Sequence, residues 1–167
     1  VTTATRPVSS KLPTVGSVPA ATVDGPDRGG TRSAGVASTL ARVEELGLAN
    51  VRLVHGDALR FVGRLGDGTL SGIRIFFPDP WPKKRHHKNR ILQTDFLEAL
   101  AGRAGEGTPL YFRTDHAEYF GAVAALIPTL KTWRLDPAAA WPLERETVFQ
   151  ARAPAYQSLV AIRTSHP

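Results

Sequence analysis

Short apolar segments of strand length alternate with amphipathic helical segments along most of this chain, and this alternation limits its fold more than any other feature. Apolar content and bounding turn residues predict strands at residues 51–55, 73–77, 110–114, 132–135 and 158–162. Helical spacing predicts helices at about 34–48, 58–65, 94–103 and 116–127. The alternation indicates an α/β fold with a mostly parallel sheet and right-handed crossovers. The last two strands lack a clear helix between them and are expected to pair antiparallel at one edge, whereas strand 73–77 is expected to be central and buried.

Capping and helix-breaking residues set the predicted boundaries. Gly47 is expected to cap the end of the first helix, Thr94 the start of the third, and Pro128 stops the fourth. Residues 1–33 contain no aromatic residue and carry prolines at near-even intervals, so they can bury little apolar area. We therefore predict a disordered or irregular tail over residues 1–33 and one folded domain over residues 34–167.

The charge and cysteine content narrow the class of partner. The net charge of +6 favours a polyanion, and nucleic acid ahead of a membrane. The chain has no cysteine, which excludes disulfides and thiolate metal sites, and no apolar run approaches the length of a membrane span.

Three aspartates each follow an apolar predicted strand: Asp57, Asp79 and Asp115. Ligands of open α/β sheets bind beyond the carboxyl ends of the strands, so a common edge would bring these carboxylates together. Aspartate is also common after strands as a turn or cap residue, and Asp115 with Glu118 resembles a capping box. Asp79 fits that alternative less well, because two prolines stiffen its backbone and the neighbouring Trp81 can stack on a base.

A cationic loop follows Asp79, and no acidic residue occurs between Asp79 and Asp95. Its cations attract phosphates and release counterions on binding, although a solvated surface loop is the simpler alternative. They are Lys83, Lys84, Arg85, Lys88 and Arg90. The adjacent His86 and His87 have no third ligand at useful spacing, so we predict no metal site and expect both to join an RNA surface.

Several motifs in order resemble one family, the bacterial tRNA (guanine-N7-)-methyltransferases. Residues 76–90, FFPDPWPKKRHHKNR, resemble its signature almost throughout. Residues 44–58, EELGLANVRLVHGDA, are similar to its helix and third strand, and Thr114-Asp115 resembles its strand-end pair. Residues 147–150, TVFQ, resemble its Thr-x-Phe-Glu with glutamine in the last place. The resemblance covers about residues 35–163.

The resemblance implies a Rossmann-like class I methyltransferase fold that uses S-adenosylmethionine to methylate N7 of a guanine in the variable loop of tRNA. It implies that Asp57 and Ala58 contact the adenine end of the cofactor, and that the catalytic Asp79 lies beside both the methyl group and the guanine. It further implies substrate contacts from Lys83, Asp115, Thr147 and Gln150, and RNA contacts from Arg85, His86, His87, Lys88 and Arg90. A cytoplasmic monomer or weak homodimer without metal is expected.

The N-terminal part departs from that family. A glycine-rich turn after the first strand and an acidic residue after the second are not recognisable, so the N-terminal strands are predicted to be missing or replaced. A fragment, a mispredicted start and a degenerate homologue all fit this pattern. Two other functions stay open: a non-catalytic RNA-binding remnant without cofactor binding, and a Rossmann-like methyltransferase that acts on another nucleic acid.

Overall fold

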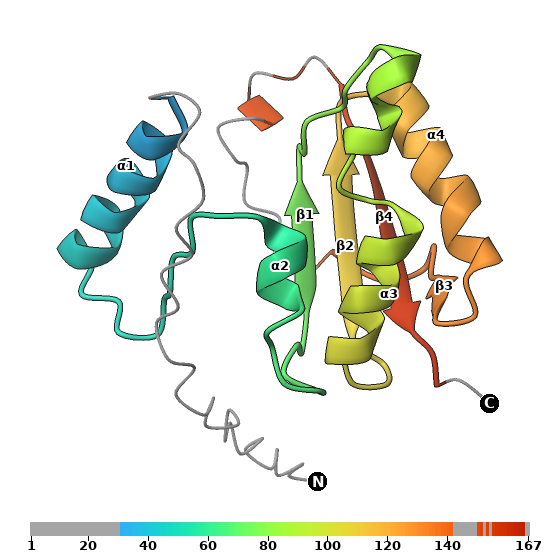
Figure 1. Ribbon diagram of the computed structural model, residues 1–167, viewed down its shortest axis with the longest axis horizontal. Helices are drawn as coiled ribbons and strands as arrows, with labels where there is room; N and C mark the ends of the chain where they lie inside the picture. The colour runs from blue at the N-terminus through green and yellow to red at the C-terminus, as the bar shows by residue number, and fades with distance from the viewer. Residues whose placement is uncertain (1–30, 142–149, 152, 154, 166–167) are drawn as a thin grey trace, which may run out of the picture. The chain divides into compact units, whose positions relative to one another are not determined.

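The computed structural model describes residues 31–141, 150–151, 153 and 155–165, which form parts of two compact units, Val1–Asp57 and Ala58–Pro167 (Figure 1). Residues 1–30 of the tail predicted over residues 1–33 lie outside the described residues, as does the predicted substrate contact Thr147. No helix in the described ranges is long and apolar enough to cross a bilayer.

The first unit contains helix α1 (Thr31–Glu45). It begins inside the stretch predicted to be irregular, because the last proline of that stretch is Pro26 and nothing at residues 31–33 breaks a helix. Gly47 ends the helix as predicted, with a φ of 60°. Its N–H donates to Glu44 O at 3.0 Å, and the N–H of Leu48 donates to Val43 O at 3.1 Å. These two bonds satisfy carbonyls that the helix end leaves open.

The predicted strand at residues 51–55 is wrong: this segment is neither strand nor helix, and residues 52–55 are exposed. The guanidinium of Arg52 donates to the carbonyls of Ala49 and Val51, both at 2.9 Å. A strand is stabilised by the ladder that it shares with a neighbour, and no described segment forms a ladder with these residues. Their apolar content alone is therefore not enough to make a strand.

The second unit is built on a four-stranded sheet of order β1-β2-β4-β3. Strands β1 (Ile73–Phe76) and β2 (Pro109–Thr114) are parallel, whereas β4 (Gln157–Arg163) pairs antiparallel with both β2 and β3 (Trp133–Leu135). The α/β class and the antiparallel C-terminal edge are confirmed. The central position expected for β1 is not observed: in the described sheet β1 lies at an edge, and Phe76 is 39% exposed.

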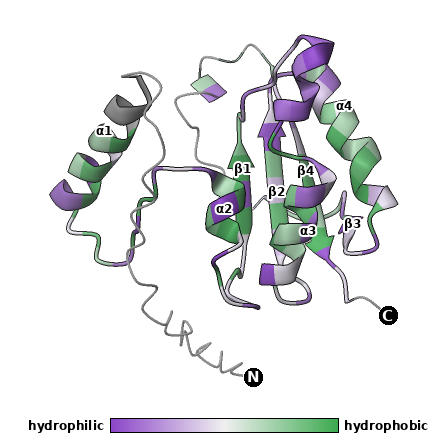
Figure 2. Ribbon diagram, viewed as in Figure 1, coloured by the Kyte–Doolittle hydropathy of each residue, from purple (hydrophilic) through white to green (hydrophobic). Residues whose placement is uncertain are grey.

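Helices α2 (Ala58–Val62), α3 (Thr94–Arg103) and α4 (Ala117–Leu126) cover one face of this sheet (Figure 1). Apolar residues meet at that face, as the hydropathy colouring shows (Figure 2). Side chains alternate along β2, so Leu110 and Phe112 enter the core while Tyr111 and Arg113 face the other side of the sheet. The core includes Leu97 and Leu100 from α3, Tyr119 and Val123 from α4, and Trp133 from β3.

Helix boundaries follow the local signals closely. Helix α3 has its predicted bounds, but Thr94 is its first residue and Gln93 occupies the N-cap position without a side-chain hydrogen bond. Helix α2 is shorter than predicted, because Gly63 follows Val62 and glycine loses the most backbone freedom in a helix. Helix α4 passes into the 3-10 turn η2 (Ile127–Thr129), which contains the Pro128 predicted to stop it.

Candidate functional site

The turn after β1 holds Asp79 in a strained backbone. Phe77 and Trp81, on either side of Pro78-Asp79-Pro80, have φ angles of 46° and 43°. Such conformations cost non-glycine residues about 1–3 kcal/mol each and persist only where their surroundings enforce them. The N–H of Phe77 donates to Arg113 O at 2.8 Å, which ties the turn to β2. Asp79 is exposed, and its Oδ1 accepts from the N–H of Trp81 at 3.2 Å.

A basic segment follows this turn at the carboxyl ends of β1 and β2 (Figure 1). It contains the 3-10 helix η1 (Lys84–Asn89), which is strongly hydrophilic (Figure 2). The ring of His86 packs edge-on against Trp81 with centroids 5.8 Å apart, and Arg85 Nε donates to His86 Nε2 at 3.2 Å. The exposed cations of the segment are Lys83, Lys84, Arg85 and Lys88. We call these four residues the exposed cations of the basic segment.

Arg90 differs from these four cations, because it is only 5% exposed. Its Nε donates to Pro80 O at 2.8 Å, and its two terminal nitrogens donate to the two carboxylate oxygens of Glu118. Its guanidinium also lies 4.7 Å from the ring centroid of Tyr119. The sequence predicted an RNA contact for Arg90; in the structure its guanidinium joins the Asp79 turn to α4, and all three of its nitrogens donate to protein acceptors.

Contacts at the start of α4 change the pKa values of Glu118 and Tyr119. The hydrogen bond from Arg90 holds the pKa of the Glu118 carboxyl below its ordinary value, and the nearby His87 and His116 act in the same direction. His87 Nε2 lies 3.8 Å from Glu118 Oε2. Burial raises the pKa of Tyr119, whose hydroxyl accepts from the N–H of Leu92 at 3.1 Å. No group of three or more His, Cys, Asp or Glu side chains that could hold a metal ion occurs within the described residues.

Asp115 lies exposed in the turn after β2. The capping-box alternative for it is wrong, because His116 caps α4: its Nδ1 accepts from the N–H of Tyr119 at 3.2 Å. Glu118, the other half of the supposed box, binds Arg90 instead. The fully buried Thr114 accepts from the N–H of His116 at 3.2 Å through its Oγ1. Asp115 is therefore held at the surface without a part in ending or starting a helix.

The turns bearing Asp79 and Asp115 lie at the same end of the sheet, because they follow two parallel, paired strands. Arg90 joins the Asp79 turn to α4, which follows the Asp115 turn, through its bonds to Pro80 O and Glu118. Asp57 belongs to the first unit, where it is exposed, and Ala58 begins α2 in the second. Gln150 is buried at 7% exposure.

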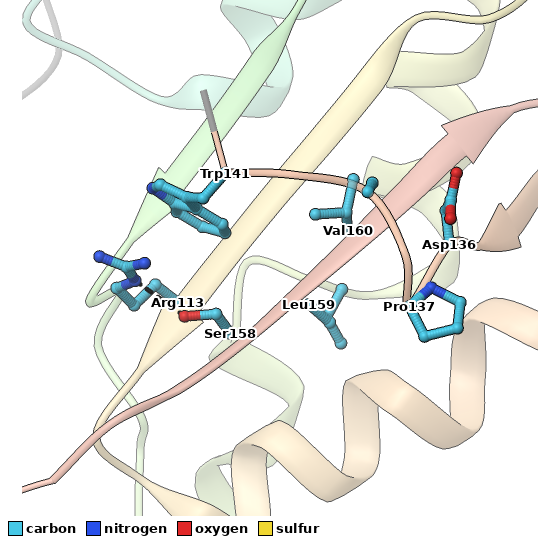
Figure 3. Close-up of a pocket in the computed structure, with 8 residues that line it drawn as sticks. Arg113, Asp136, Pro137, Trp141, Ser158, Leu159 and Val160 are labelled. Carbon is cyan, nitrogen blue, oxygen red and sulfur yellow. Dashed lines mark hydrogen bonds between the residues drawn. The ribbon is translucent and has the colours of Figure 1, made fainter. Parts of the chain in front are cut away.

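Sequence reasoning missed a cluster of arginine and aromatic side chains on the face of the sheet away from the helices. Arg113 is 5% exposed, and its guanidinium lies 4.0 Å from the ring centroid of Trp141 and 4.7 Å from that of Tyr156. Its Nε donates to Ser158 Oγ at 2.8 Å (Figure 3). Strand alternation places Arg113 on this face, but no local signal connects it with residues so distant in sequence.

A pocket of about 250 Å³ adjoins this cluster (Figure 3). The pocket is lined by residues of β2, of β4 and of the segment after β3: Arg113, Asp136, Pro137, Ala139, Trp141, Ser158, Leu159 and Val160. Of the described residues predicted to bind cofactor, guanine or RNA, none is among the residues that line it. We take the end of the sheet around Asp79 and Asp115 as the candidate site. The Arg113 cluster contacts the Asp79 turn through Phe77, whose ring packs edge-on against Tyr156 with centroids 6.3 Å apart.

Comparisons with known proteins match this chain to methyltransferases. A family model described as a putative methyltransferase matches residues 30–152. The tRNA (guanine-N(7)-)-methyltransferase of Mycolicibacterium vanbaalenii is 41% identical over 107 residues, which cover 62% of this chain and 40% of that protein. The proteins of the same name from Bordetella parapertussis and Nocardia farcinica are 47% and 44% identical over 88 and 93 residues.

The chain spans only part of these relatives, since the matches to the last two cover 52% and 55% of this chain but 35% of each relative. Among solved structures, an SAM-dependent O-methyltransferase from Thermotoga maritima matches with a TM-score of 0.49 and 11% identity, over 81% of this chain and 48% of that one.

Proposed function

This chain belongs to the putative methyltransferase family whose model it matches over residues 30–152, and from this premise we propose that it methylates N7 of a guanine in the variable loop of tRNA. The methyl donor is S-adenosylmethionine, and a tRNA substrate implies a cytoplasmic location. The names of the relatives that are 41% to 47% identical support the substrate. The observation that carries the proposal is the exposed Asp79 carboxylate on a strained turn, directly followed by the exposed cations of the basic segment.

The residue types suit this chemistry. Guanine N7 already carries an accessible lone pair, so no base is needed to create the nucleophile, and the task is to align that lone pair with the methyl group. The purine gains positive charge as the methyl group is transferred. A fixed carboxylate at Asp79 stabilises that charge or accepts a guanine N–H. Oδ1 of Asp79 accepts from the N–H of Trp81, and we propose that Oδ2 is the oxygen that contacts the guanine.

Residues near Asp79 are proposed to bind the guanine and the rest of the tRNA. Trp81 offers an aromatic ring for stacking on a base, and Asp115 lies at the same end of the sheet to contact the substrate. Lys83 contacts the substrate, as do Thr147 and Gln150 by resemblance, whereas Arg85, His86, His87 and Lys88 contact the RNA. The exposed cations bind phosphates and so fix the register of the tRNA without reading its bases.

The described residues supply only part of the site expected to bind S-adenosylmethionine. When bound, it supplies an electrophilic methyl group on a sulfonium. Asp57, Ala58 and Asp79 would contact it, but none of the described strands is followed by a glycine-rich turn that could approach the cofactor closely. The residues of this chain thus account better for binding and orienting guanine and RNA than for holding the methyl donor.

A methyl-transfer assay on tRNA tests the proposal. Asp79→Asn keeps the side-chain shape and removes the charge, so we expect turnover to fall by about 10²–10³-fold. The dissociation constant for tRNA should stay nearly unchanged, because the exposed cations are intact. Asp67→Asn is the matched control, since Asp67 is exposed and pairs with Arg103 in another part of the fold.

Three results would contradict the proposed function or favour one of its alternatives. Unchanged turnover in Asp79→Asn contradicts the role of Asp79. A wild-type chain that binds tRNA but does not bind S-adenosylmethionine at about millimolar concentration, where affinity corresponds to only about 4 kcal/mol, is the non-catalytic remnant. Mapping the methylated atom separates guanine N7 from any other nucleic-acid target.

A further inference from the structure

We propose that Arg90 and Glu118 are a positioning pair that holds the Asp79 turn in place against the Asp115 turn. The pair touches no reacting atom in this proposal and acts through Asp79. The inference rests on the proposed function, because it explains how the carboxylate used in methyl transfer is fixed. It replaces the RNA contact that the sequence predicted for Arg90.

The contacts of Arg90 connect the Asp79 turn with the first turn of α4, which follows Asp115. Pro80, whose carbonyl accepts from Arg90 Nε at 2.8 Å, is the residue immediately after Asp79. Glu118 lies in the first turn of α4, shortly after Asp115, and accepts from both terminal nitrogens of the guanidinium. One planar group therefore spans from the turn after β1 to the helix after β2.

The surroundings of Arg90 make this connection rigid. The side chain is 3% exposed, and its guanidinium lies against the ring of Tyr119. Tyr119 is itself fixed, because its hydroxyl accepts from the N–H of Leu92 and its backbone N–H donates to His116. A guanidinium is a preorganised fork that can donate in several directions at once, whereas lysine is a point charge on a flexible stem.

Strain in the Asp79 turn explains why such a connection is needed. Phe77 and Trp81 both have positive φ angles, a conformation that relaxes unless other contacts enforce it. Phe77 is held on one side by its bond to Arg113 O, and the Pro80 carbonyl is held on the other by Arg90. Without Arg90, the segment from Pro80 to Trp81 loses its link to α4, and the Asp79 carboxylate loses its fixed direction.

Indole N–H signals in an NMR spectrum of the 15N-tryptophan-labelled full chain report on the turn without requiring activity. The chain has three tryptophans, and Trp→Phe variants assign them. We expect Arg90→Lys and Glu118→Gln to shift the Trp81 signal. The Trp133 signal should not move, because its indole donates to Leu97 O in the core. Arg103→Lys is the control, since it alters another arginine–carboxylate pair, Arg103 with Asp67.

Kinetics and RNA binding show whether the position matters for the reaction. We expect kcat to fall by up to about 10²-fold in Arg90→Lys and in Glu118→Gln, because small misplacements near a reacting group have effects of that size. The tRNA dissociation constant and its salt dependence should not change. The double variant should lose no more than either single variant, because the two residues act as one unit.

Two results would overturn the inference. One is a Trp81 signal and a kcat that stay at wild-type values in Glu118→Gln, which is the safer variant for folding because the Glu118 side chain is 55% exposed. The other is an Arg90→Gln variant that loses tRNA affinity together with salt dependence, which would make Arg90 an RNA contact. If the wild-type chain proves inactive, the proposed function fails, and the Trp81 signal alone decides whether the pair positions the turn.

Discussion

The salt dependence of tRNA binding offers a quantitative test of which cations face the RNA. Neutralising one phosphate contact lowers the slope of log K against log salt by about 0.7–0.9. The structure exposes Lys83, Lys84, Arg85 and Lys88 and buries Arg90. A variant with glutamine at the four exposed positions should therefore lose about 3–4 units of slope, whereas Arg90→Gln, which also removes one positive charge, should lose none.

The expected effect on affinity follows from that slope. Each contact accounts for about a 3-fold loss of affinity between 50 and 200 mM salt, so the four together account for roughly 10²-fold over that range. Fluorescence anisotropy of labelled tRNA at several salt concentrations measures it. Lys131→Gln is the control, because Lys131 is an exposed cation in the turn before β3. An unchanged slope in the four-fold variant, or an equal loss in Lys131→Gln, would refute the assignment of the RNA surface.

Two further predictions concern stability. Trp133→Phe should lower the free energy of unfolding in urea by about 1–3 kcal/mol, because the buried indole loses its hydrogen bond to Leu97 O and leaves a small cavity; a change near zero would contradict the core placement of β3. Glu118 has a pKa lowered from 4.5, so the stabilisation from its carboxylate is present above about pH 4.5 and is lost as the pH falls through the folded pKa. The stability advantage of wild type over Glu118→Gln should therefore shrink as the pH is lowered below about 4.5, and an advantage that does not change with pH in that range would show that the charge is not involved.

Local signals predicted the helices well because their causes are local. Gly47 ends α1 through its own positive φ and two nearby hydrogen bonds, and Pro128 marks the end of α4 because it lacks an N–H. The bounds of α3 follow from an apolar stripe that its own residues carry. Such features need no information from distant parts of the chain.

Strand predictions were less secure because a strand depends on its neighbours. Residues 110–114 and 158–162 became strands that pair with each other, whereas residues 51–55, which are similarly apolar, did not. The same reason explains β1, whose apolar content indicated a central strand although it forms an edge of the described sheet. Pairing is a non-local event, and the apolar content of one segment does not reveal it.

The sequence by itself determined the chemistry of the candidate site: an isolated carboxylate between prolines, an aromatic neighbour and a run of cations, all within residues 76–90. Only the tertiary structure decided how these groups are used. It exposed four cations, turned Arg90 inward onto Pro80 and Glu118, and assigned the helix cap to His116 instead of Asp115. The physical reason is that residue type specifies charge and shape, whereas burial and the choice of partner depend on which distant segments the sheet brings together.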